Sequence, residues 1–108
     1  MNTTEATLLE LFSRIPRRHS ADNVKEIQSI ISSYRDCLTG IESENIFYEK
    51  NTPVFFNQLD NIRSIVKKST DNKASKKNKD NYFDEASAAL KDSMQELLEL
   101  YANGSRKE

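Results

Sequence analysis

Apolar residues recur at intervals of three and four positions in four stretches of the chain, a spacing that places side chains on one face of an α-helix. The stretch that follows Ser20 is the most regular, with apolar side chains at Val24, Ile27, Ile31, Tyr34 and Leu38. Its steps of 3, 4, 3 and 4 residues form a short heptad seam, typical of coiled-coil-like packing, that requires a partner helix. Ser20 is a suitable N-cap, and Gly40 is predicted to end this helix.

Three further stretches predict helices with one apolar stripe each. The first covers 4–15 and stops before Pro16, because residues that precede proline avoid the helical region. Another begins at Thr52-Pro53, a pair typical of an N-cap and a first helical position. The last is expected to start at Asp80 or Asn81 and to end at Gly104. The stretch 41–50 is ambiguous and can hold a short additional helix.

These four helices define the predicted fold class. Nowhere do apolar and polar residues alternate with the period of a strand, so we expect an all-α protein. Short connections favour antiparallel neighbours, which predicts a small up-and-down four-helix bundle in a single domain, 1–108. The alternative is a three-helix core with a peripheral short N-terminal helix. In either case Ile31 and Leu90 should be fully buried.

A segment without apolar anchors lies before the last helix. Residues 67–81 contain no large apolar side chain, and the stretch is rich in lysine. Because such a segment cannot bury itself in a core, we predict that 69–79 is a flexible, lysine-rich linker.

Charges are segregated along the chain although the net charge is only −1. Residues 61–79 hold seven cations and one acid, whereas 80–101 hold one lysine and six acids. Likewise 14–25 is basic, and 36–49 contains four acids and no cation. These segments either form solvated faces of neighbouring helices or create a field that steers a charged partner.

Several classes of chemistry lack the residues they need. His19 is the only histidine and Cys37 the only cysteine, so neither a structural zinc site nor a nucleophile–histidine pair is expected. Two glycines cannot build a phosphate-binding loop. We therefore expect no enzyme, cofactor or metal. The sequence also lacks a signal peptide and a membrane span, which favours the cytoplasm, or the nucleus if the source is eukaryotic.

Two groups of residues are candidates for binding a partner. Four aromatic residues surround Thr52-Pro53, and they either plug one end of the core or anchor a partner protein: Phe47, Tyr48, Phe55 and Phe56. The second group is a basic patch made of Arg14, Arg17, Arg18, Lys67, Lys68, Lys73, Lys76, Lys77 and Lys79.

The sequence thus predicts a non-enzymatic protein–protein interaction module that uses helix faces and a basic loop. Small adaptors, chaperones, immunity-type proteins and subunits of complexes share this size and helical profile. Homo- or hetero-oligomers formed through helix faces are compatible with it. The alternative is a nucleic-acid-associated protein that uses the basic patch. We consider nucleic acid the weaker hypothesis, because the lysine-rich segment offers no aromatic side chain for base stacking.

Overall fold

The computed structural model describes residues 3–106 of the chain, with side chains described for 3–103. Its helices are α1 (Thr3–Arg14), α2 (Ala21–Glu42), α3 (Ile46–Asn51), α4 (Pro53–Lys68) and α5 (Lys76–Arg106). The described residues form no strand. The predicted all-α fold class is confirmed.

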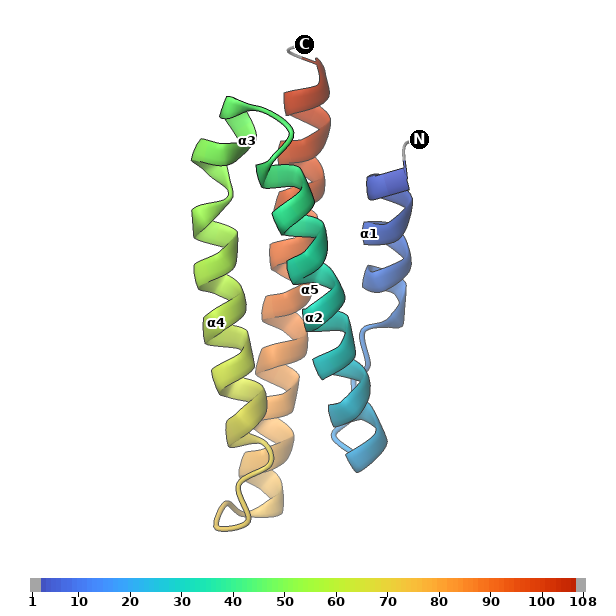
Figure 1. Ribbon diagram of the computed structural model, residues 1–108. Coiled ribbons are helices and arrows are strands. Elements are labelled where there is room, and N and C mark those ends of the chain that lie inside the picture. Colours follow the sequence, from blue (N-terminus) through green and yellow to red (C-terminus); the bar gives the residue numbers. More distant parts are fainter. Residues whose placement is uncertain (1–2, 107–108) are drawn as a thin grey trace.

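The four longer helices run alternately in opposite directions, and the short α3 caps one end between α2 and α4 (Figure 1). Helix α1 packs on α2 and α5, and α4 packs on the same two helices. The molecule is elongated, with principal dimensions of 50 × 23 × 17 Å. Because Leu8 and Leu11 of α1 are buried, the N-terminal helix contributes to the core rather than lying at its periphery.

The apolar stripes found in the sequence meet in this core. Every residue of the seam in α2, from Val24 to Leu38, is buried. Ile31 retains 3% of its surface exposed and Leu90 none, as predicted. The helical phase assigned to α2 and α5 is therefore correct.

Of three predicted features of α2 and α4, two are confirmed and one is wrong. The hydroxyl of Ser20 accepts a hydrogen bond from the Asn23 N–H at 3.0 Å, which confirms the N-cap of α2. Pro53 is the first residue of α4, as expected. The prediction that Gly40 ends α2 is wrong, because the helix continues to Glu42. Ile41 is 1% exposed, and its burial outweighs the modest cost of a glycine inside a helix.

The start of the last helix also differs from the prediction. Helix α5 begins at Lys76 instead of Asp80 or Asn81, so 76–79 of the expected linker are helical. Ser75 caps this helix, because its hydroxyl accepts from the Asn78 N–H at 3.1 Å. Lysine has a high intrinsic helix propensity even when its side chain is exposed. The first turn of α5 therefore forms without buried apolar residues. The helix also extends past Gly104 to Arg106.

The connection that remains between α4 and α5, residues 69–75, is a hydrogen-bonded turn. The Ala74 N–H donates to the Asp71 carbonyl at 3.1 Å, and the Lys73 N–H donates to the Asp71 carboxylate at 2.9 Å. The buried Ser69 hydroxyl donates to the Val66 carbonyl at 2.6 Å. The turn therefore reverses the chain in seven residues and places the first residues of α5 beside the end of α4.

Within the described residues, none of the helices combines the length and the apolar character needed to cross a membrane.

Candidate functional site

The aromatic cluster lies at the end of the molecule where α3 connects α2 to α4. Tyr48 is 1% exposed and Phe55 4%, so both belong to the core. The Tyr48 hydroxyl donates to the Tyr101 carbonyl at 2.8 Å, and the two rings stack with their centroids 5.2 Å apart. Neither Tyr48 nor Phe55 offers a surface to a partner. Of the two alternatives for the aromatic cluster, these two residues fill the end of the core.

The other two aromatic residues of the cluster are half-buried against this core. The Phe47 ring meets Tyr48 edge-on at 5.5 Å, and the Arg35 guanidinium carbon lies 5.6 Å from the centre of the Phe56 ring. The large apolar side chains that reach solvent here are instead Ile46, 67% exposed, and Val54, 54% exposed. They are aliphatic residues at the starts of α3 and α4.

The two basic segments of the sequence come together at the opposite end of the molecule. The loop between α1 and α2 packs on the beginning of α5, where His19 Nδ1 lies 3.6 Å from an Asp80 carboxylate oxygen. The His19 ring contacts Phe83 edge-on, and the Ser87 hydroxyl donates to the Pro16 carbonyl at 2.7 Å. These contacts hold residues 14–20 beside the turn between α4 and α5.

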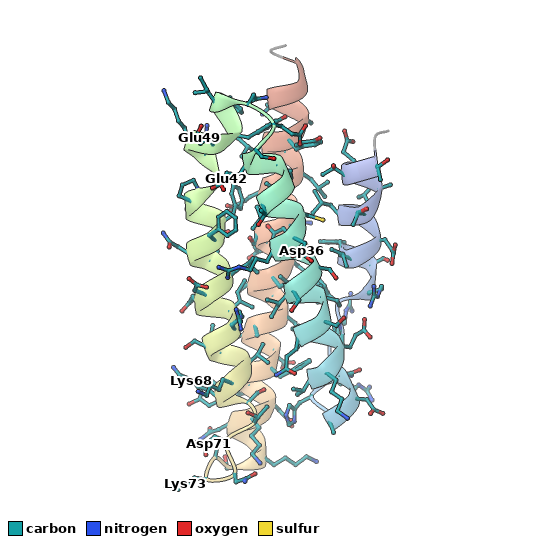
Figure 2. All side chains as sticks on the ribbon, viewed as in Figure 1. Asp36, Glu42, Glu49, Lys68, Asp71 and Lys73 are labelled. Atoms are coloured by element: carbon teal, nitrogen blue, oxygen red, sulfur yellow. The ribbon has the colours of Figure 1, made fainter. Side chains whose placement is uncertain are left out.

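We call this region, formed by residues 14–28 and 63–80, the basic end. It contains eleven Lys and Arg side chains against four carboxylates. Segments 36–49 and 92–99, toward the other end, carry seven carboxylates and no cation. Figure 2 shows Glu42 and Glu49 toward the top of the molecule and Asp36 near its middle, whereas Lys68 and Lys73, with Asp71 between them, lie in the lower part. The long axis measures 50 Å, several times the screening length of about 8 Å at physiological salt, so the charges at the two ends are screened from one another.

Most cations of the basic end are available to a ligand. Arg14 is an exception, because it pairs with Glu26 and Glu10. The hydrogen bond to Glu26, together with its charge, raises the pKa of Arg14. Lys68 lies 5.9 Å from the centre of the Tyr82 ring. The other cations of the basic end form no ion pair with any described residue: Arg17, Arg18, Lys25, Arg63, Lys67, Lys73, Lys76, Lys77 and Lys79.

Two adjoining hollows lead into this end. The first lies between α2 and α4, has a volume of about 450 Å³, and is lined by Gln28, Ile31, Ser32, Arg63, Ser64, Val66, Lys67 and Thr70. The second, of about 400 Å³, is lined by His19, Ala21, Val24, Lys25, Gln28, Ser69, Thr70 and Lys79. Gln28 and Thr70 line both, so the two hollows adjoin, and we call them together the α2–α4 groove.

Among the groove residues that the predicted basic patch omits are two cations, Lys25 and Arg63, and the polar Gln28. Arg63 stands alone in the sequence, outside the lysine-rich run, and Gln28 is uncharged. The spacing of four residues between Arg63 and Lys67 is a signal that they share a face of α4. The sequence contains no signal that this face lies opposite Gln28.

The described residues contain no cluster of three or more His, Cys, Asp and Glu side chains that could hold a metal ion. Cys37 is half-buried, and burial, followed by the charge of Asp36, raises the pKa of its thiol. Burial likewise raises the pKa of Tyr34, whose hydroxyl lies 2.9 Å from Ser93 Oγ. These groups are held in their neutral forms inside the helix packing.

The chain matches no protein-family model, no curated protein and no solved structure. The geometry of its surface is therefore the basis for a functional assignment.

Proposed function

We propose that this chain is a non-enzymatic protein-binding module whose basic end receives an acidic segment of a partner protein. The observation that carries the proposal is the meeting of eleven cations and only four carboxylates around a groove at one end of the molecule. Such an excess of charge raises the rate of encounter with an acidic surface and selects against basic partners.

The burial of the aromatic cluster supports this choice of surface. Residues that dominate interface energetics must be accessible in the free protein, and Tyr48 and Phe55 are not. Phe47 and Phe56 already pack against the core. The basic end, by contrast, keeps most of its cations exposed and unpaired; the exceptions are Arg14, which is paired, and Lys79, which is half-buried.

The choice of a protein over a nucleic acid rests on the aromatic residues near the groove. The apolar residues of the groove lining, Ile31 and Val66, are 3% and 1% exposed, so they offer little surface to either kind of partner. Single-stranded nucleic acids are bound through aromatic rings that stack on bases. At the basic end Phe83 is fully buried, and Tyr82 is half-buried beside Lys68.

The non-enzymatic part of the proposal rests on the composition. The single histidine contacts Asp80 and Phe83 in a packed loop, and the single cysteine carries a raised thiol pKa. A nucleophile needs an adjacent base or a lowered pKa to be activated. Both residues therefore serve the packing of the bundle in this proposal.

The test is affinity capture from an extract of the source organism, followed by mass spectrometry. The variant replaces Lys76, Lys77 and Lys79 with glutamate. Negative charges in the first turns of a helix favour its dipole, so α5 should remain folded. The matched control replaces the exposed Lys50, at the other end, with glutamate.

We expect the wild-type chain and the Lys50→Glu control to retain the same acidic proteins, and the triple variant to lose them. Treatment of the extract with nuclease should not change this result. Capture that disappears with nuclease supports the nucleic-acid alternative instead. Equal capture by the triple variant contradicts a role for the basic end.

A further inference from the structure

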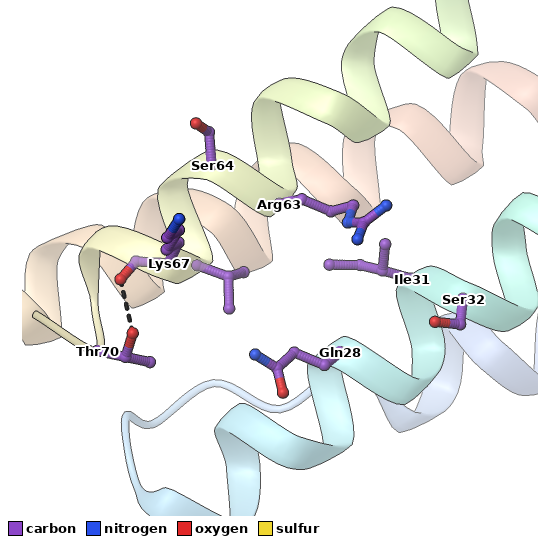
Figure 3. Close-up of a pocket in the computed structure, with 8 residues that line it drawn as sticks. Gln28, Ile31, Ser32, Arg63, Ser64, Lys67 and Thr70 are labelled. Atoms are coloured by element: carbon purple, nitrogen blue, oxygen red, sulfur yellow. Dashed lines mark hydrogen bonds between the residues drawn. The ribbon is translucent and has the colours of Figure 1, made fainter.

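The α2–α4 groove has the composition of a receptor for anions. In Figure 3, Gln28 and Ser32 come from α2 on one side, while Arg63 and Lys67 come from α4 on the other. The Lys67 carbonyl accepts the Thr70 hydroxyl at 2.7 Å, which fixes the end of α4 beside the groove. Ile31, 3% exposed, and Val66, 1% exposed, form its base between these polar walls.

The positive charge in this groove is not neutralised. The lining of the hollow between α2 and α4 contains two cations, Arg63 and Lys67, and no carboxylate. Neither Arg63 nor Lys67 forms an ion pair with a described residue. Asp60, the nearest acid before Arg63 in the sequence of α4, lies 3.4 Å from Arg35 and pairs with it. The two cations can therefore bind an external carboxylate without breaking an existing ion pair.

We propose that the α2–α4 groove binds an acidic helix of the protein partner through two carboxylates spaced one helical turn apart. This inference rests on the proposed function and names the chemistry of its partner. Arg63 and Lys67 are four residues apart, a rise of about 6 Å along α4. Two acids with the same spacing on an opposing helix match this separation.

Each lining residue has a distinct part in this recognition. The guanidinium of Arg63 offers a planar pair of donors that fits a carboxylate, whereas the Lys67 ammonium acts as a compact charge. The Gln28 amide can donate from the opposite wall. Ile31 and Val66 are only 3% and 1% exposed, so recognition in this groove rests on the charged and polar side chains of its walls.

The extent of the groove favours a peptide segment over a free anion. The hollow between α2 and α4 measures about 450 Å³, and it continues past Gln28 and Thr70 into the second hollow of about 400 Å³. Lys25 and Lys79 line this continuation. A small carboxylate fills only a fraction of such a volume, whereas a helix can follow it toward the basic end.

The probe is a fluorescein-labelled synthetic helix that carries two glutamates four residues apart, compared with the same peptide carrying glutamines. Binding is measured by fluorescence anisotropy for the wild-type chain and for Arg63→Gln and Lys67→Gln. Lys50→Gln is the matched control, because it removes the same charge from an exposed position at the other end of the molecule. All three positions are exposed, and circular dichroism checks the fold.

We expect Arg63→Gln and Lys67→Gln each to weaken binding about fivefold, the factor that corresponds to one solvent-accessible ion pair. Lys50→Gln and the wild-type chain should bind alike, and the glutamine peptide should bind the wild type weakly. In ¹⁵N spectra, the side-chain amide of Gln28 should shift when the glutamate peptide is added.

Other results overturn the inference in distinguishable ways. If Arg63→Gln binds the peptide like wild type while the triple lysine variant loses its partners, the groove is not the receptor but the proposed function stands. If glutarate displaces the peptide at equal concentration, the site takes a free anion instead of a helix. If the peptide does not bind and the triple variant keeps its partners, both proposals fail.

Discussion

Replacement of Tyr48 distinguishes a core residue from a partner anchor. The side chain is 1% exposed, its hydroxyl donates to the Tyr101 carbonyl at 2.8 Å, and its ring stacks on Tyr101 at 5.2 Å. Tyr48→Phe removes the hydrogen bond alone and should lower the free energy of unfolding by about 1 kcal/mol. Tyr48→Ala also removes a buried, stacked ring, and should lower it by about 3–5 kcal/mol.

The assay is equilibrium unfolding in urea, followed by helical circular dichroism, with Ile46→Ala as the control. Ile46 belongs to the same short helix but is 67% exposed, so its truncation should change the free energy of unfolding by less than about 0.5 kcal/mol. If Tyr48→Ala is as stable as Ile46→Ala, Tyr48 does not occupy the core and the packing assigned to α3 is incorrect. A graded loss from Phe to Ala supports the packing described above.

Two further substitutions test buried hydroxyls, and one labelling experiment tests the half-buried thiol. Tyr34→Phe removes the hydroxyl that lies 2.9 Å from Ser93 Oγ, and thermal or urea unfolding should show a loss of about 1 kcal/mol; an unchanged midpoint contradicts the hydrogen bond. The hydroxyl of Thr52 is fully buried and has no hydrogen-bond partner among the described residues. Thr52→Val should therefore raise the free energy of unfolding by about 1 kcal/mol. A lower free energy of unfolding in this variant refutes the reasoning. Because burial raises the pKa of the Cys37 thiol, less thiolate is present near neutral pH, and alkylation by iodoacetamide should be slower in the folded chain than in denaturant. Equal alkylation rates contradict the burial of this thiol.

Local signals explain why most helices could be predicted. The apolar seam of α2, the Ser20 cap and Pro53 at the start of α4 all depend on residues close together in sequence. The start of α5 at Lys76 is also a local feature, since the Ser75 cap acts three residues away, but a search for apolar periodicity cannot detect it. The continuation of α2 through Gly40 is different, because it depends on the burial of Ile41.

Part of the candidate site could likewise be predicted from the sequence, and part depends on the packing of the helices. The basic segments 14–25 and 61–79 are visible as charge runs, and loop length together with helix direction brings them to one end. The groove between them is not visible in the sequence, because Gln28 and Arg63 are 35 positions apart and meet only through the packing of α2 beside α4.

The sequence by itself determined the helical fold class, because periodicity and caps act within a few residues, and it determined the segregation of charge. Only the tertiary structure decided which aromatic residues are buried. Tyr48 lies in the core because α3 crosses the end of the bundle and brings it onto Tyr101, 53 positions further along the chain. Such long-range contacts depend on how whole helices pack, and no local pattern of residues encodes them.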